Sequence, residues 1–301
     1  MNSTLDVVIV GSSAAGLSAA LYLGRFRRRV IVFDTQKPAN RFSNASHSFF
    51  TRDGVAPSDL VAIGREQLAR YETVEIQNGE VSTIAPEGEH FMVTLADGSS
   101  YRTRKVLLAT GLKDTLPAIE GIESFFGRSV FHCPYCDGWE QRDQPVAIIN
   151  SGEASLHAAK LLRVLTDQLT LCTNGDESFD QAARTLLNQL NIRLIEMPIQ
   201  RLEGHDTQVE SIVFSDGSKL ACKAVFVRLT STQHAALAEQ LGCAMTDTGL
   251  VQVDEQGKTS VSGVYAAGDL ANRMRQIIFA SSQGAAAAIA INMALIAEDF
   301  G

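Results

Sequence analysis

The sequence predicts an α/β protein built from two doubly wound nucleotide-binding (Rossmann-like) domains, the second inserted into the first. The order of a buried strand, a glycine turn, a helix, a second strand, a hairpin and a closing strand occurs twice along the chain. After the second copy, residues 259–269 return to a pattern that completes the first domain. The length of 301 residues suits about two domains of ~150 residues each.

The first domain opens with a strand–turn–helix–strand unit. Residues 5–10 are apolar except for Asp6, as in a strand that is buried on both faces. The turn Gly11-Ser12-Ser13-Ala14-Ala15-Gly16 follows, then a helix at 17–23 and a strand at 30–33 that ends in Asp34. Further expected elements are a long functional loop at 39–57, a helix at 60–71, a hairpin with strands at 91–95 and from 101 onward, and a closing strand at 105–108.

The second domain repeats this order. Residues 146–149 predict a buried strand, and residues 156–165 predict a helix with apolar residues at helical spacing. Further expected elements are a strand at 169–171, a hairpin with strands at 209–214 and from 220 onward, a closing strand at 224–227 and, back in the first domain, a small-residue helix at 281–297. We therefore expect the first domain to comprise residues 1–113 and 232–301, and the inserted domain residues 114–231.

Composition and charge exclude two classes of partner. The formal net charge of −8 argues against a nucleic-acid-binding or anionic-membrane-binding surface. The apolar stretch 284–297 includes Asn292 and is shorter than a membrane span of ~20 residues, so a buried helix is expected there. Residues 1–6 show no signal-peptide pattern, so we expect a cytoplasmic protein.

Three separated segments predict a flavin site. The first glycine turn lets backbone N–H groups approach a pyrophosphate at a helix N-terminus. Asp34, ~20 residues later, is placed to hydrogen-bond a ribose hydroxyl. Asp269 follows a strand and can accept a hydrogen bond from a ribityl hydroxyl, while the helix after Gln276 can stabilise negative charge on a reduced flavin. The predicted FAD-binding residues are Gly11, Ser12, Ala14, Ala15, Gly16, Asp34, Asn40, Val81, Ala109, Thr110, Gly111, Gly268, Asp269, Arg275, Gln276 and Ile277.

The motif Cys133-Pro134-Tyr135-Cys136-Asp137-Gly138 carries the redox chemistry. A CxxC pair can close and reopen a small disulfide ring, and a nearby helix start lowers the pKa of one thiol. The single cysteines Cys172, Cys222 and Cys243 are expected in the core, and no second ligand pair is spaced for zinc, so no metal is expected. A partly buried carboxyl at Asp137 suits general-acid work, with a helix-capping acid as the alternative. Trp139 is expected to pack beside the dithiol.

In order and spacing, these motifs resemble those of the low-molecular-weight thioredoxin reductases over nearly the whole chain. The resemblance implies a homodimeric flavoprotein that binds FAD and carries the dithiol on its inserted domain. It also implies that Cys136 lies against the flavin, that Cys133 attacks the partner disulfide and that Asp137 moves protons to and from the departing thiolate. The partner it implies is a thioredoxin-like protein or a small disulfide or dithiol.

The second glycine turn departs from this family pattern. Members that use NADPH carry G-x-G-x-x-A, whereas this chain has Asn150-Ser151-Gly152-Glu153-Ala154-Ser155. The 2′-phosphate of NADPH needs basic residues after the next strand, as in the family's H-R-R stretch. Here the chain reads Cys172-Thr173-Asn174-Gly175-Asp176-Glu177, and its two acids repel a phosphate. We therefore expect that NADPH is not an efficient electron donor.

The direction of electron flow stays open at this stage. As a reductase, the protein would pass electrons from a donor such as reduced ferredoxin, or through an unknown second cofactor, to FAD, the dithiol and a partner disulfide. As a dithiol oxidase of the gliotoxin type, it would oxidise a small dithiol and return the electrons to oxygen. The same motifs would also suit an NADPH-dependent thioredoxin reductase or a flavin redox sensor, and Asp137 argues against the sensor.

Overall fold

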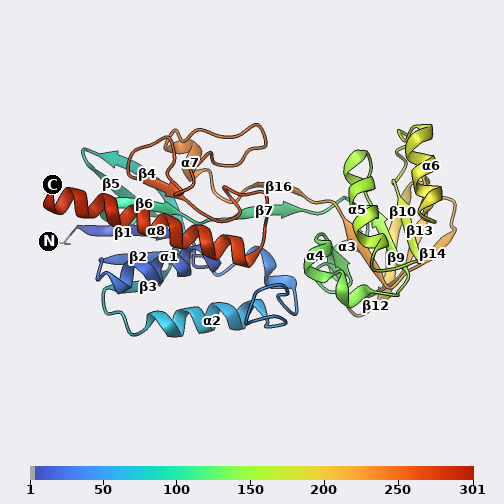
Figure 1. Cartoon of the computed structure of the whole chain (residues 1–301), viewed down its shortest axis with the longest axis horizontal. Helices are drawn as coiled ribbons and strands as arrows, with labels where there is room; N and C mark the ends of the chain where they lie inside the picture. Colours follow the sequence, from blue (N-terminus) through green and yellow to red (C-terminus); the bar gives the residue numbers. More distant parts are fainter. Residues whose placement is uncertain (1–3) are drawn as a thin grey trace. The chain divides into compact units, whose positions relative to one another are not determined.

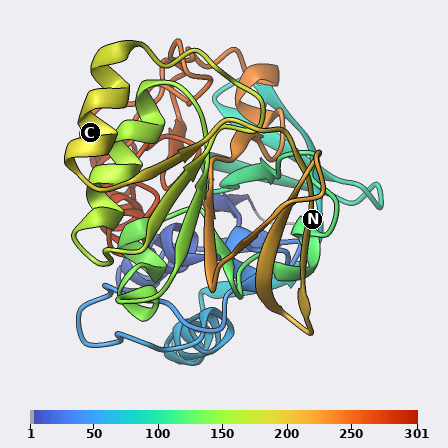
Figure 2. The same cartoon turned by 90° about the vertical axis from the view of Figure 1, so that its right-hand side faces the viewer.

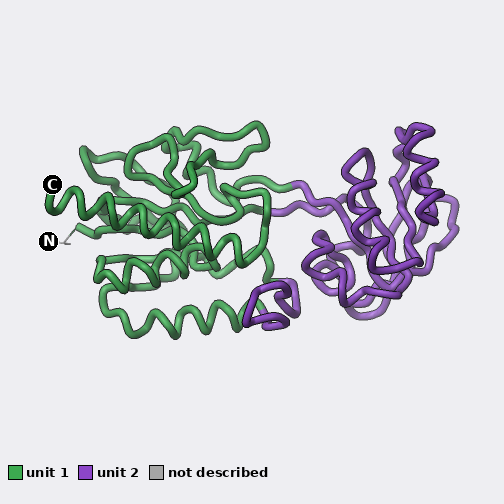
Figure 3. The backbone as a smooth tube through the Cα atoms, viewed as in Figure 1, with its two compact units in different colours: residues 1–41, 57–113, 231–301 green, residues 42–56, 114–230 purple. Residues whose placement is uncertain are grey.

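The computed structural model describes residues 4–301, which divide into two compact units (Figures 1 and 3). Unit 1 contains the chain up to Arg41, Pro57–Lys113 and Ser231–Gly301, and unit 2 contains Phe42–Ala56 and Asp114–Thr230. The chain passes between the units at β7 (Leu112–Thr115) and β16 (Thr230–Gln233), which pair as a two-stranded sheet. Segment 42–56 therefore groups with unit 2, although unit 1 precedes and follows it in sequence.

Unit 1 is built on a seven-stranded sheet. Its strands are β1 (Leu5–Val10), β2 (Val30–Asp34), β3 (Val74–Asn78), β4 (Val81–Glu87), β5 (His90–Leu95), β6 (Ser100–Leu108) and β17 (Val264–Ala266). The order is β3-β2-β1-β6-β5-β4, and β17 pairs with β6. Strands β3, β2, β1, β6 and β17 pair in parallel, whereas β4, β5 and β6 form an antiparallel meander.

The helices of unit 1 cover this sheet. They are α1 (Ala14–Arg25), α2 (Pro57–Leu68), the short α7 (Leu237–Gln240) and α8 (Ile277–Phe300), with a 3-10 turn η1 (Ala39–Phe42). Alternate residues of β1 serve two cores, because successive side chains of a strand point to opposite faces. Val7 packs with residues of α1 and α8, and Val8 packs with residues of β4 and β5. Helix α2 begins and ends three residues earlier than the expected helix at 60–71.

Helix α8 is longer than the small-residue helix predicted at 281–297. By length and composition alone it could cross a membrane, which is weak evidence because core helices of soluble proteins meet the same criteria. Ala287, Ile291 and Leu295 place one face of α8 in the core of unit 1, and Asn292 accepts a hydrogen bond from Nε of Arg28 at 2.8 Å. The predicted burial of this segment is therefore correct for one face.

Unit 2 repeats the plan of unit 1 on a smaller scale. Its five-stranded parallel sheet has the order β11-β10-β9-β15-β8, with β8 (Val130–Phe131), β9 (Val146–Ile149), β10 (Leu169–Cys172), β11 (Arg193–Ile195) and β15 (Ala224–Val227). A three-stranded antiparallel sheet contains β12 (Ile199–His205), β13 (Gln208–Phe214) and β14 (Lys219–Ala221). Strands β9, β10 and β15 are buried throughout, as their apolar runs predict.

Two layers sandwich the parallel sheet of unit 2. Helices α5 (Glu153–Arg163) and α6 (Gln181–Gln189) pack on one face through Leu162 and Leu187. The antiparallel sheet packs on the other face through Ile212, where the short helix α3 (Ile122–Phe125) joins the same core. Figure 2 shows the two helices and the golden antiparallel strands on opposite sides of the sheet. The short helix α4 (Pro134–Asp137) and the 3-10 turn η2 (Trp139–Gln141) follow β8.

This packing predicts unequal costs for two truncations within unit 2. Ile212→Ala should lower the free energy of unfolding by about 2–5 kcal/mol, because Ile212 is fully buried between the two sheets. Val164→Ala is the control, because Val164 is 84% exposed, and should change stability by no more than about 0.5 kcal/mol. Denaturant unfolding followed by the fluorescence of Trp139, the one tryptophan, reports on unit 2. Equal effects of both substitutions would contradict the layered core.

Candidate active site

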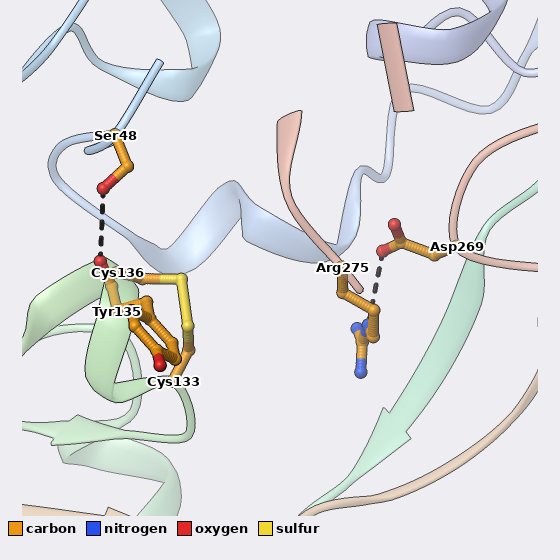
Figure 4. Close-up of a disulfide and its surroundings, with 6 residues drawn as sticks. All are labelled: Ser48, Cys133, Tyr135, Cys136, Asp269 and Arg275. Carbon is orange, nitrogen blue, oxygen red and sulfur yellow. Dashed lines mark hydrogen bonds and ion pairs between the residues drawn. A yellow bond between two sulfur atoms is a disulfide. The ribbon is translucent and has the colours of Figure 1, made fainter. Parts of the chain in front are cut away.

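The dithiol occupies the start of a very short helix in unit 2. Cys133 is the N-cap of α4 in an extended conformation, Pro134 is the first helical residue, and Cys136 lies one turn later. Cys133 and Cys136 form a disulfide with their Cα atoms 5.3 Å apart (Figure 4). Proline is well suited to the first helical position because its φ is fixed near the helical value and its missing N–H is not needed there. The spacing of three residues then places both sulfurs on one face.

Asp137 ends α4 and is half-buried. Burial and, to a smaller extent, the negative charge of Glu140 raise the pKa of its carboxyl, His47 lowers it, and the pKa that results is about 6. An acid with a pKa near 6 can both donate and accept a proton close to neutral pH. The alternative interpretation of Asp137 as an N-capping acid is wrong, because the N-cap is Cys133.

Segment 42–56 packs with the dithiol region inside unit 2. The Ser48 hydroxyl lies 3.4 Å from the carbonyl oxygen of Tyr135, to which it donates a hydrogen bond (Figure 4). The rings of Phe42 and Phe126 meet edge-on at 5.8 Å. A Cβ at Gly127 would lie 2.7 Å from the backbone of Phe42, so the glycine permits this close approach. The sequence predicted a functional loop here but gave no sign of this contact.

Large aromatic side chains around the dithiol are exposed on unit 2. Phe50, Tyr135 and Trp139 are 85%, 70% and 64% exposed. The guanidinium of Arg142 lies 4.3 Å from the centre of the Trp139 ring, a cation–π contact. The expectation that Trp139 is a packed residue is therefore wrong, because its ring covers an arginine rather than entering the core.

The first glycine turn brings together predicted FAD residues of unit 1. Gly11 has a φ of 109°, and a Cβ there would lie 2.3 Å from the carbonyl oxygen of Ala109. A Cβ at Gly268 would meet the Cβ of Ala15 at 3.2 Å. Three segments that are distant in sequence, ending β1, β6 and β17, therefore meet at one edge of the sheet, where a doubly wound fold binds its ligand.

Asp34 and Arg65 complete this edge. An oxygen of Asp34 accepts a hydrogen bond from the backbone N–H of Ser12 at 2.6 Å. Arg65, on α2, donates to the Ser12 hydroxyl at 2.8 Å and lies 3.8 Å from Asp34. Among the described residues 4–301, nothing hydrogen-bonds the buried Nε of Arg65. The sequence did not predict Arg65, because nothing in the α2 pattern marks an arginine that reaches a turn 53 residues away.

The other predicted FAD residues lie in separate places within unit 1. Asn40 lies in the 3-10 turn η1, and the side chain of Val81 is buried in the core that includes Phe33, so only its backbone can serve a ligand. Nε of Arg275 lies 3.3 Å from Asp269 (Figure 4). Gln276 caps α8 and Ile277 begins it. Of the remaining predicted residues, Ala14 and Gly16 lie in the first turns of α1, and Thr110 and Gly111 follow β6.

In the second glycine turn, in unit 2, Ser151 is held by the side chains of Asn150 and Asp176. The backbone N–H of Ser151 donates to Oδ1 of Asn150 at 2.9 Å. Asp176, from the loop after β10, accepts hydrogen bonds from Ser178, which lower the pKa of its carboxyl, and the Ser151 hydroxyl lowers that pKa further. One backbone N–H of the turn, that of Ser151, and the Ser151 hydroxyl are thus engaged by protein side chains rather than left for a pyrophosphate.

Comparison with known proteins identifies a family and several relatives of this chain. The model of the pyridine nucleotide-disulphide oxidoreductase family matches residues 5–284. The chain belongs to this family. A thioredoxin reductase of Treponema pallidum is 32% identical over 300 residues, covering 96% of this chain and 96% of that protein.

Solved structures extend the comparison to the fold. The crystal structure of HlmI has a TM-score of 0.95 and 35% sequence identity, covering 99% of this chain and 95% of HlmI. An oxidoreductase from Agrobacterium tumefaciens has a TM-score of 0.92 and 32% identity, covering 98% and 99%. This pyridine nucleotide-disulphide oxidoreductase is therefore an FAD-dependent disulfide oxidoreductase of thioredoxin-reductase type, with the predicted two-domain α/β fold.

The residues of the first glycine turn fit FAD. The turn needs glycine at Gly11 and Gly16, because a Cβ at either position would collide with backbone oxygens. The buried, unpartnered Nε of Arg65 beside Ser12 offers a hydrogen-bond donor that a phosphate or hydroxyl of the cofactor would satisfy, within the described part of the chain.

The raised pKa of Asp137 makes stability depend on pH. Folding raises the pKa of its carboxyl from the ordinary 3.8 to about 6. The free energy of unfolding therefore falls as pH rises through this window, by at most about 3 kcal/mol. Asp137→Asn should therefore be more stable than the parent at about pH 7.5 and little changed at about pH 4. Thermal unfolding at both pH values measures this, with the exposed Asp143→Asn as control. Equal changes at both pH values would refute a buried, titrating Asp137.

Proposed function

We propose that this FAD-dependent enzyme exchanges electrons with a thiol or disulfide partner through Cys133 and Cys136, without efficient use of NADPH. The observation that carries the second part is the acid Asp176 beside the glycine turn of unit 2, where it accepts a hydrogen bond from the Ser151 hydroxyl. FAD, when bound, supplies the two-electron centre with which the dithiol exchanges electrons.

Charge around the second turn supports the exclusion of NADPH. The loop after β10 places Asp176 and Glu177 where a 2′-phosphate would need cations. Arg184 does not supply the missing cation, because it already donates two hydrogen bonds to Glu196 at 2.8 and 2.6 Å. A bidentate arginine–carboxylate pair of this kind is strong and geometrically specific, so the arginine is already engaged.

The dithiol exchanges electrons by two successive thiol–disulfide steps. In the reducing direction, the Cys133 thiolate bonds one partner sulfur, and the partner disulfide breaks to release a thiolate. Cys136 then attacks Cys133, which closes the Cys133–Cys136 bond and releases the second partner sulfur. Two electrons pass to the partner, and the two released thiolates take up two protons. The oxidising direction runs the same steps in reverse, with oxygen as the final acceptor.

Asp137 handles a proton in either direction. Its carboxyl follows Cys136 directly, and its pKa of about 6 leaves both protonation states accessible near neutral pH. The protonated form can donate to a leaving thiolate, and the ionised form can accept from an attacking thiol. A redox sensor that does not turn over would have no use for such a group.

The exposed aromatic side chains support a partner that contacts the dithiol helix. Tyr135 lies between the two cysteines and is 70% exposed, and Trp139 follows the helix. A thioredoxin-like protein or a small apolar disulfide or dithiol fits this surface, because aromatic residues dominate the energetics of protein and ligand contacts. Reduced ferredoxin remains the alternative electron donor in this proposal.

A homodimer in the cytoplasm is part of the same proposal. Helix α8 leaves Ile278, Ile289 and Met293 between 41% and 60% exposed, on a helix whose other face is in the core. Apolar side chains grouped on one exposed helix face are typical of a subunit interface. The flavin domain of one copy would then pack on that of a second copy.

Anaerobic mixing tests the donor directly. The FAD-loaded protein is mixed with NADPH, NADH, dithiothreitol or reduced ferredoxin, and the loss of flavin absorbance is followed. We expect dithiothreitol or ferredoxin to reduce the flavin at least about 100-fold faster than NADPH, because the 2′-phosphate of NADPH would meet two acids and no cation in the loop after β10. Rapid reduction by NADPH would overturn the proposal. Hydrogen peroxide formed from added dithiol in air would select the oxidase direction.

A further inference from the structure

Segment 42–56 brings a histidine to the dithiol region of unit 2. Nδ1 of His47 lies 3.6 Å from Oδ1 of Asp53, and Nε2 lies 3.5 Å from Oε1 of Glu140. The side chain of His47 is 22% exposed, whereas those of Asp53 and Glu140 are 72% and 37% exposed. The imidazole therefore lies between one carboxylate on the surface and another that follows the dithiol helix.

The backbone of this segment holds His47 in place. Ser46 and Val55 pair across the loop, with the Ser46 N–H donating to the Val55 carbonyl at 2.7 Å. Asp53 also accepts a hydrogen bond from the Ser48 N–H at 2.7 Å, which ties it beside the histidine. Ser48 has a φ of 62°, in the left-handed region that non-glycine residues seldom adopt. The contacts on both sides of His47 fix a backbone that would otherwise be disfavoured.

We propose that His47 is a positioning residue for the thiol–disulfide chemistry: its imidazole holds Glu140 and balances that carboxylate's charge, so that Asp137 can exchange a proton with the dithiol. The inference rests on the proposed exchange through Cys133 and Cys136. It gives segment 42–56, which lies 77 residues or more before the dithiol in sequence, a part in the chemistry of unit 2.

The charges that act on Asp137 come from two packed elements. Glu140, on η2, raises the pKa of Asp137, and His47, on the loop, lowers it. Helix α5 also packs near α4 and carries Glu153 and His157, but the pKa of Asp137 is set by burial, Glu140 and His47. Asp53 faces His47 from its far side. His47 therefore offsets part of the effect of Glu140, whose charge would otherwise keep Asp137 protonated to higher pH.

Substitutions of His47 and of Glu140 should therefore shift the pH profile of the reaction in opposite directions. The probe is dithiothreitol, and the readout is the anaerobic rate of flavin reduction from about pH 5 to pH 8, divided by the thiolate fraction of the probe. In the parent protein this corrected rate should change with a midpoint near pH 6, where Asp137 ionises. His47→Asn should move the midpoint to higher pH by roughly half a pH unit, and Glu140→Gln should move it to lower pH by a similar amount.

The double variant and a matched control complete the test. His47→Asn combined with Glu140→Gln should return the midpoint close to that of the parent, because both opposing charges are gone. His205→Asn is the control: His205 is 84% exposed, also pairs with an aspartate, and should leave the profile unchanged.

The outcomes separate this inference from the proposed function. If dithiothreitol fails to reduce the flavin of the parent protein, the proposed function fails. If the parent reacts but His47→Asn lowers the rate equally at every pH, His47 has only a structural role and the inference is overturned. If His47→Asn does not fold, the Glu140→Gln variant decides. The inference about His47 is overturned if Glu140→Gln leaves the midpoint of the pH profile unchanged.

Discussion

The short first turn of α4 is the constraint on which the chemistry of this protein depends. A proline at the first helical position and a spacing of three residues place Cys133 and Cys136 on one face, and the same turn leaves Asp137 half-buried directly behind them. Mainly because of this burial, the pKa of the Asp137 carboxyl is raised to about 6. One short helix thus places the two cysteines next to a carboxyl that can gain or lose a proton near neutral pH.

The two domains share one plan but have diverged at their glycine turns. In unit 1 the turn needs glycine at Gly11 and Gly16, and Arg65 presents an unsatisfied donor there, within the described part of the chain. In unit 2 Asn150 and Asp176 supply acceptors from the protein itself. The proposed loss of NADPH use is compatible with an intact fold, because apolar strands keep the fold while a few polar residues at the turn decide what binds.

The sequence predicted the central strands because β9 and β15 are continuous apolar runs, and β1 and β10 are each interrupted by a single polar residue. It did not predict β4 or β12, in each of which one side chain or two are buried and polar residues interrupt the apolar ones, nor the short α6. The dithiol and the glycine turns are local motifs and could be recognised. The contacts of Arg65 with Asp34 and of His47 with Glu140 could not, because they span 31 residues or more and local patterns do not encode such contacts.

The protonation of Asp137 in the native state tests this account most directly. Carbon-13 NMR of the oxidised, FAD-loaded protein labelled at its aspartate carboxyl carbons follows each aspartate as pH is varied, and the Asp137→Asn variant assigns the resonance. The account predicts a resonance that titrates with a midpoint near pH 6 and is missing from the variant. A midpoint near the ordinary pKa of 3.8 would show a solvated carboxylate and contradict the proton-exchanging site proposed for the dithiol.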